Sequence, residues 1–162
     1  MNILALDPAT HCGFAHSCGL SGVWDLSVRR DESSGMRLIR LRGKLDEIKR
    51  TVGVDILVYE ANRYSGAGKR GNAQVVQSEI QGVIKVWGED NKVDYRAYSS
   101  KEVKKHATGN GNAGKDAMKD AAVTRFKRVI EDDNECDALW ILDFAKKEFD
   151  SGDGTGLQQP AL

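Results

Sequence analysis

The hydrophobic pattern begins with an apolar run from Ile3 to Leu6. The run is too short for a helix and has no polar alternation, so it predicts a central strand covered on both faces. Asp7 ends the run, and Pro8, which has no N–H to donate, prevents the strand from continuing. A carboxylate at the exit of a buried strand either caps the following turn or needs a cation beside it.

The pattern then changes its period twice. Alternating residues predict strands over 13–18 and 22–26, joined by a turn at 19–22. From Ser33 to Val52, apolar residues recur at three- and four-residue steps, which predicts an amphipathic helix. Residues 54–60, V-D-I-L-V-Y-E, predict a second deeply apolar strand that also ends in a carboxylate, Glu60. If the two apolar strands are neighbours, Asp7 and Glu60 lie close together.

The second half continues with helices and one more strand. The spacing predicts a helix over 73–87 that ends near Gly88, a strand over 94–98, and a capping box at 99–102 that opens a short basic helix. A glycine-rich loop at 108–115 precedes a helix over 115–130. The last helix opens at 131–134 and is apolar nearly all round, yet it contains Asp137, one turn after Asp133.

Composition bounds the class of protein. The 162 residues suit one domain, residues 1–149, followed by a disordered tail at 150–162. Lys plus Arg and Asp plus Glu number 24 each, so a DNA-binding surface requires local segregation of charge. Three cysteines and no signal segment fit the cytoplasm. No apolar run approaches the ~18 residues that span a bilayer, so we expect a soluble protein without a membrane partner.

The loop that follows Glu60 has two readings. Residues 63–72, R-Y-S-G-A-G-K-R-G-N, are basic and glycine-rich, and they include one aromatic side chain. The loop is either a flexible surface connection or a DNA contact, with Arg63, Lys69 and Arg70 on phosphates and Tyr64 stacked on a base. Its place directly after Glu60 favours the DNA contact.

Two other motifs argue against alternative chemistries. In the glycine-rich loop, Lys115 is followed by Asp116 where a nucleotide P-loop has a hydroxyl residue, so no nucleotide cofactor is expected. Cys12, His16 and Cys18 share one strand face, but no second ligand pair completes a tetrahedron. An ordinary sheet face is therefore favoured over a zinc site.

The acids at the ends of the two apolar strands and on the last helix define candidate chemistry. Bringing Asp7, Glu60 and Asp137 within about 4 Å would cost roughly 4 kcal/mol per pair at an effective dielectric near 20, which demands cations. All-oxygen ligands select Mg²⁺ or Mn²⁺ over zinc. Two such ions, about 3.5 to 4 Å apart, activate a water and stabilise the leaving oxygen in phosphodiester hydrolysis.

These motifs resemble the RuvC-type Holliday junction resolvases of the RNase H-like superfamily, over nearly the whole chain up to about Lys147. The resemblance is carried by L-A-L-D-P-A-T with G-F-A following, by V-Y-E, by S-S-K-E-V-K-K-H-A-T-G-N-G-N-A-G-K, and by C-D-A-L. It implies an α/β fold with a mixed five-stranded sheet, three antiparallel strands followed by β-α units, flanked by helices. It also implies divalent-metal acids and a homodimer acting on four-way DNA junctions. The compact chain looks more like phage-encoded relatives, which would act in the host cytoplasm.

The resemblance also implies roles for single residues. Asp7, Glu60 and Asp137 match metal-binding acids, and Lys104 and Lys115 match basic residues near the scissile phosphate. Two positions depart from the family's pattern. Arg63 stands where the family has an aromatic, with Tyr64 one residue later. Asn134 stands where the family has a carboxylate, so either its amide oxygen or Asp133, which shares a helical face with Asp137, completes the site. Asp133 is preferred.

The leading hypothesis is a Mg²⁺-dependent endonuclease that resolves four-way and other branched DNA by paired nicks from a dimer. A broader nuclease for flaps and forks is a close alternative. A second alternative is a junction-binding protein with weak or lost cleavage, because Asn134 supplies no negative charge to the metal site. An actin-like ATPase or sugar kinase half is a third, although those folds need two such domains.

Overall fold

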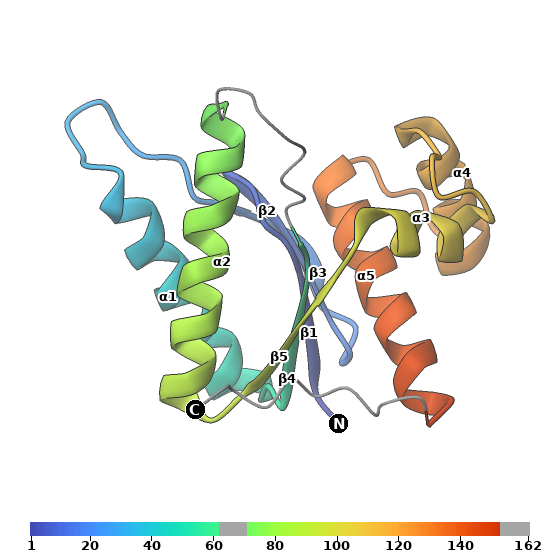
Figure 1. Cartoon of the computed structure of the whole chain (residues 1–162), viewed down its shortest axis with the longest axis horizontal. Helices are drawn as coiled ribbons and strands as arrows, with labels where there is room; N and C mark the ends of the chain where they lie inside the picture. Colours follow the sequence, from blue (N-terminus) through green and yellow to red (C-terminus); the bar gives the residue numbers. More distant parts are fainter. Residues whose placement is uncertain (62–70, 153–162) are drawn as a thin grey trace.

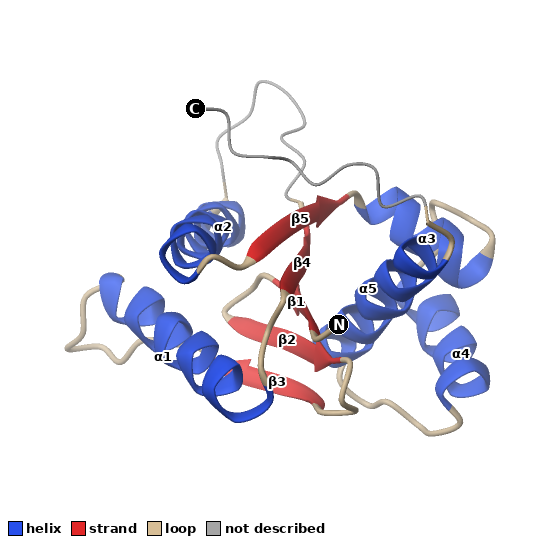
Figure 2. Cartoon of the chain, turned by 90° about the horizontal axis from the view of Figure 1, so that it is seen from below, coloured by secondary structure: helices blue, strands red, loops and turns tan. Residues whose placement is uncertain are grey.

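The computed structural model of the chain describes residues 1–61 and 71–152, which form three layers, with one sheet between two layers of helices (Figures 1 and 2). The sheet has five strands in the order β3-β2-β1-β4-β5. Strands β1, β2 and β3 pair antiparallel, whereas β4 and β5 run parallel to β1. The strands are β1 (Ile3–Asp7), β2 (His11–His16), β3 (Ser21–Asp25), β4 (Ile56–Glu60) and β5 (Asp94–Tyr98). This is the mixed sheet that the family resemblance implies.

Helices cover both faces of the sheet. Figure 2 shows α1 and α2 on one side and α3, α4 and α5 on the other, with α5 next to the sheet. Their bounds are α1 (Gly35–Val52), α2 (Asn72–Asn91), α3 (Ser100–Thr108), α4 (Lys115–Phe126) and α5 (Asp133–Asp150). Across residues 1–61 and 71–152, none of the helices combines the length and the apolar composition of a membrane span.

Strand β1 shows how the alternation of side chains sorts residues between the two layers. Leu4 and Leu6 are fully buried in the core with α1 and α2, and Ile3 and Ala5 are buried in the core with α5. Because successive side chains point to opposite faces, Asp7 falls on the α5 face with Ile3 and Ala5. The same period therefore aims the carboxylate toward the last helix.

Several element boundaries differ from the prediction. Strand β2 begins and ends two residues before the predicted span 13–18, because the chain already turns after His16 and Gly19 adopts φ 103°. Strand β3 is shifted by one residue from 22–26. The prediction that α2 ends near Gly88 is wrong. Gly88 stays helical, and a Cβ there would lie 2.6 Å from the Tyr95 ring, so the glycine permits close packing instead of ending the helix.

Local backbone conformation also sets a boundary in the second half of the chain. Helix α4 ends at Phe126 instead of 130, because Lys127 adopts a left-handed conformation with φ 58°. Helix α5, predicted to open at 131–134, runs from Asp133 to Asp150. The predicted disordered tail at 150–162 lies outside the described residues from residue 153 onward.

The structure agrees with an ordinary sheet face at Cys12 and His16. His16 is buried, its Nε2 donates to the Gly53 carbonyl (2.8 Å), and its Nδ1 accepts from the Cys18 N–H (3.0 Å). Both ring nitrogens are thereby used within the core. Cys12 is fully buried, and Cys18 is exposed beyond the strand.

Candidate active site at the carboxyl edge of the sheet

Two acids lie at the same edge of the sheet because their strands are parallel neighbours. Leu6 of β1 pairs with Tyr59 of β4, so the next residue of each strand, Asp7 and Glu60, sits at the carboxyl end of its strand. Ile56 and Val58 belong to the core with α5, and the alternation places Glu60 on that face as well. The juxtaposition of these carboxylates thus follows from register alone.

Helix α5 brings a third acid to this edge. Its first turn lies directly against β2: a Cβ at Gly13 would come 1.9 Å from the Asn134 carbonyl oxygen, so only glycine fits there. Asp132 caps the helix by accepting hydrogen bonds from the backbone N–H groups of Asn134 and Glu135. Asp137 follows one turn later, and this close docking brings it within electrostatic reach of Asp7 and Glu60.

Burial and mutual repulsion perturb these acids. The pKa of Asp7 rises from its ordinary 3.8 to about 8, first through burial and then through the charges of Asp137, Glu60 and Asp132. The pKa of Asp137 rises to about 7, first through burial and then through the charges of Glu60 and Asp133. A protein that keeps acids together at this cost offers a site for positive charge.

Basic and hydroxyl side chains oppose this effect. Burial raises the pKa of Glu60, whereas a hydrogen bond from the Ser100 hydroxyl and the charge of Lys104 lower it. Lys104 and Lys115 likewise lower the pKa of Asp137. These side chains line one pocket of about 220 Å³, whose walls are Glu60, Ser100, Val103, Lys104, Ala113, Gly114, Lys115, Met118 and Asp137.

Local sequence explains how the two lysines reach the pocket. Ser99 and Glu102 form the predicted capping box, which sets the start of α3 and hence the direction of Lys104. Gly109, with φ 82°, ends α3, and α4 begins directly at Lys115. The glycine-rich loop thus returns the chain so that two helices present one lysine each.

Asp133 has a different environment from the other acids. It forms ion pairs with Lys119 (2.8 Å) and Lys115 (3.3 Å), and these lysines lower its pKa. Its charge nevertheless reaches Asp137 and raises the pKa of that group. Asp133 therefore lies near the pocket but already has cationic partners, and both Asp133 and Asn134 remain candidates for the fourth ligand.

The donor set fits a hard divalent cation, because Asp7, Glu60 and Asp137 offer only carboxylate oxygens and their raised pKa values report an excess of negative charge. Across residues 1–61 and 71–152, however, no group of three or more His, Cys, Asp and Glu side chains is arranged closely enough to hold an ion.

Sequence reasoning did not single out two residues of the site. Asp132 acts on Asp7 by charge, and Ser100 donates a hydrogen bond to Glu60. Asp132 could have been found as the cap before the last helix, but nothing in the sequence links Ser100 to Glu60. The predicted DNA contacts Arg63, Tyr64, Lys69 and Arg70 lie outside the described residues.

A known protein is similar to this chain over most of its length. Over 149 residues the chain is 28% identical to the crossover junction endodeoxyribonuclease RuvC of Brachyspira hyodysenteriae (strain ATCC 49526 / WA1), covering 87% of this chain and 91% of that protein. No family model matches the chain.

Solved structures share the fold. The structure of Thermus thermophilus RuvC in complex with a Holliday junction substrate superposes with a TM-score of 0.77 at 18% identity, covering 94% of this chain and 96% of that one. A second Thermus thermophilus RuvC structure gives a TM-score of 0.74 at 19% identity, covering 94% and 97%. In sequence and in fold, the chain is RuvC-like, as its motifs predict.

Proposed function

We propose that the protein is a divalent-metal-dependent endonuclease that resolves four-way and other branched DNA in the cytoplasm, or in a host cytoplasm if a phage encodes it. The observation that carries this proposal is the pocket in which Glu60 and Asp137 meet Lys104 and Lys115, with Asp7 coupled to it by charge. The arrangement joins a cation site to groups that bind a phosphate, within a RuvC-like chain.

Asp7, Glu60 and Asp137 would hold the metal, which we take to be two Mg²⁺ or Mn²⁺ ions. When bound, the ions supply an activated water and stabilise the oxygen that leaves the phosphorus. Lys104, beside Glu60 and Asp137, holds the scissile phosphate and offsets the charge that develops on it. Lys115 is 82% exposed, so its ammonium group is free to move from Asp133 to a phosphate.

The fourth ligand is Asp133 or Asn134, and a pair of variants separates them. If Asp133 binds metal, Asp133→Asn weakens Mn²⁺ affinity and Asn134→Ala does not. If Asn134 binds through its amide oxygen, the result is reversed. Titration calorimetry with Mn²⁺ measures both, and Asp150→Asn, an exposed acid at the far end of α5, is the matched control.

Contacts to the junction are proposed for the loop after β4. Arg63, Lys69 and Arg70 would bind phosphates, and Tyr64 would stack on a base at the branch point. Tyr64→Ala should therefore lower the rate of four-way junction cleavage by a larger factor than it lowers the affinity for duplex DNA. Equal losses on both DNAs would contradict a role at the branch point.

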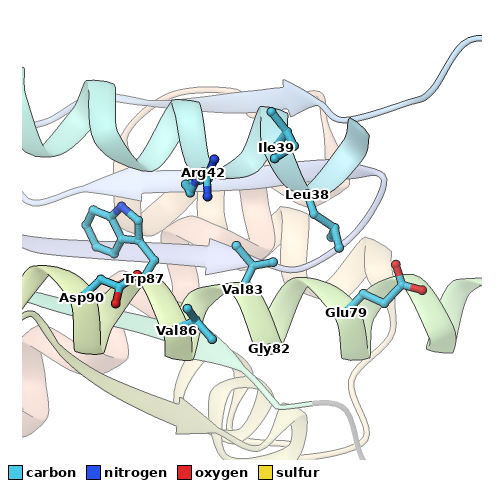
Figure 3. Close-up of a pocket in the computed structure, with 9 residues that line it drawn as sticks. All are labelled: Leu38, Ile39, Arg42, Glu79, Gly82, Val83, Val86, Trp87 and Asp90. Atoms are coloured by element: carbon cyan, nitrogen blue, oxygen red, sulfur yellow. The ribbon is translucent and has the colours of Figure 1, made fainter. Parts of the chain in front are cut away.

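Paired nicks require a dimer, and one surface suits its formation. A pocket of about 390 Å³ lies between α1 and α2 (Figure 3). Its rim exposes apolar side chains, among them Ile39, which is 49% exposed, and Val86, which is 62% exposed. This apolar surface lies on the α1–α2 side of the sheet, whereas Asp7, Glu60 and Asp137 lie on the α5 side. A dimer formed through it therefore leaves the acids of each protomer free for DNA.

The dimer has a direct test. Val86→Glu should shift the protein to monomers in analytical ultracentrifugation and should convert paired cuts into single nicks. Val129→Glu is the control, because Val129 is also exposed but lies between α4 and α5. An unchanged oligomeric state in Val86→Glu would remove α2 from the interface.

The activity is tested with a panel of four-way junction, fork, flap and duplex DNA in Mg²⁺ and in Mn²⁺. We expect cleavage of the junction, none from Asp7→Asn, and none in EDTA. Equal cleavage of forks and flaps would identify a broader debranching nuclease. Equal activity from Asp7→Asn would refute the proposed active site.

A second candidate function is junction binding with feeble or lost cleavage. It is favoured by Asn134, a neutral group among the candidate ligands. A gel shift of the four-way junction without any product in Mn²⁺ would select it.

A further inference from the structure

A buried carboxylate outside the pocket joins three helices. Asp143 of α5 is only 9% exposed, and its Oδ1 accepts hydrogen bonds from Nε (3.0 Å) and a terminal nitrogen (2.8 Å) of Arg125 on α4. Its Oδ2 lies 2.8 Å from Nε2 of His106 on α3. Arg125 and His106 lower the pKa of Asp143 despite its burial, so it accepts as a carboxylate.

Aromatic packing holds this group in place. The His106 ring lies 5.3 Å from the Phe144 ring and 6.0 Å, edge to face, from the Trp140 ring. The indole N–H of Trp140 donates to the Met118 carbonyl of α4 (3.1 Å). The helices α3, α4 and α5 therefore meet at a point where both the hydrogen bonds and the ring contacts are directional.

The members of this group sit on the helices that carry the basic side chains of the pocket. His106 follows Lys104 by two residues on α3, Arg125 shares α4 with Lys115, and Asp143 shares α5 with Asp137. A rigid helix transmits the placement of one residue to another within a few turns. The way that α3 and α4 are fixed on α5 thus sets where both lysines stand relative to Asp137.

We propose that Asp143, His106 and Arg125, here called the Asp143 clamp, are positioning residues that hold Lys104 and Lys115 in register with Asp137 for cleavage. This inference rests on the proposed nuclease function. None of the three lines the pocket of Glu60 and Asp137. An apolar contact would hold three helices together equally well, whereas a forked hydrogen bond to a buried carboxylate fixes their relative rotation.

The test separates the rate of the chemical step from binding. Asp143→Asn removes the charge at constant size, and Arg125→Gln removes the fork. A misplacement of the order of 1 Å costs about 100-fold in rate, so we expect the single-turnover rate at saturating junction to fall about 10- to 100-fold in each variant. The dissociation constant for the junction in EDTA should change by less than about threefold, since the lysines remain present.

A double variant and a control complete the design. Because the clamp acts as a unit, Asp143→Asn with Arg125→Gln should be no slower than the slower single variant. Asp120→Asn, which removes an exposed acid from α4, should cleave at the wild-type rate. All rates are compared at a temperature where circular dichroism shows each variant folded, and if Asp143→Asn does not fold, Arg125→Gln decides.

Three outcomes would overturn the inference. An unchanged rate in Arg125→Gln with a lowered melting temperature would reduce the clamp to a stabilising contact. Weakened binding with an unchanged rate would make Arg125, which is 60% exposed, a direct DNA contact. If the rate losses of the two single variants multiply in the double variant, Asp143 and Arg125 do not act as a unit. Absence of cleavage by the wild-type protein, in contrast, refutes the proposed function itself.

Discussion

Two aspartates on α5 have pKa values that are shifted in opposite directions. Asp137 and Asp143 are less than two turns apart on α5, yet the pKa of Asp137 rises to about 7 and that of Asp143 falls. Asp143 has a guanidinium and an imidazole on its oxygens, whereas Asp137 faces Glu60 and Asp133. For Asp143 the two hydrogen-bonding partners outweigh burial, whereas for Asp137 burial and the neighbouring acids raise the pKa together.

The comparison separates structural from functional carboxylates. The Asp143 clamp is complete within the protein, so its charges stabilise the fold as it stands. The acids at the sheet edge repel one another, and Lys104, Lys115 and Ser100 offset this repulsion only in part. A protein that leaves such repulsion unsatisfied reserves the site for a ligand.

Cleavage of the junction should show the largest difference. Asp137→Asn removes a metal ligand and should lower the rate of cleavage by at least about 1,000-fold, as for a residue that acts within a catalytic unit. Asp143→Asn should cost far less, because it only misplaces groups. Both are measured on a four-way junction in Mg²⁺, and a larger loss in Asp143→Asn would break the distinction.

Stability without metal should change in opposite directions. In EDTA at pH 8, Asp7→Asn removes a repelled acid and should raise the free energy of unfolding. Asp143→Asn disrupts satisfied hydrogen bonds and should lower it by about 1 to 3 kcal/mol. Urea denaturation monitored by circular dichroism measures both. A loss of stability in Asp7→Asn would mean that the edge acids are already neutralised by the protein.

Added metal should stabilise the protein through the acids at the sheet edge and not through the Asp143 clamp. Mg²⁺ at a few times its dissociation constant contributes about 1 kcal/mol, which raises the melting temperature by about 2 to 4 °C. Asp7→Asn should lose this shift, and the Asp143→Asn variant should keep it. A wild-type protein without any shift would speak for the junction-binding alternative.

The stability of the metal-free protein should also depend on pH. Since the pKa of Asp7 is raised in the folded state, its contribution is fully present below about 3.8 and is lost as the pH rises through about 8. Metal-free protein should therefore become less stable across this range, and Asp7→Asn should flatten the decline. Proton release on Mn²⁺ binding, measured between pH 6 and 8, should fall as the pH rises.

Local signals were sufficient where an element is decided locally. Strand β5 and the start of α3 fall where the pattern predicts, since the capping box at Ser99 and Glu102 is a short-range contact. The predicted helix end near Gly88 is wrong, because the residue that decides the role of this glycine, Tyr95, lies on the adjoining strand. Boundaries that depend on packing cannot be read from a window of sequence.

The sequence by itself determined that Asp7 and Glu60 end two apolar strands and that Asp137 sits on a buried helix. From this, the parallel register brings the acids to one edge. Only the tertiary structure decided their ionisation, the part of Ser100 and Asp132, and the pairing of Asp143 with helices α3 and α4. The reason is physical: a pKa depends on desolvation and on charges contributed by several elements, and these distances exist only in the folded chain.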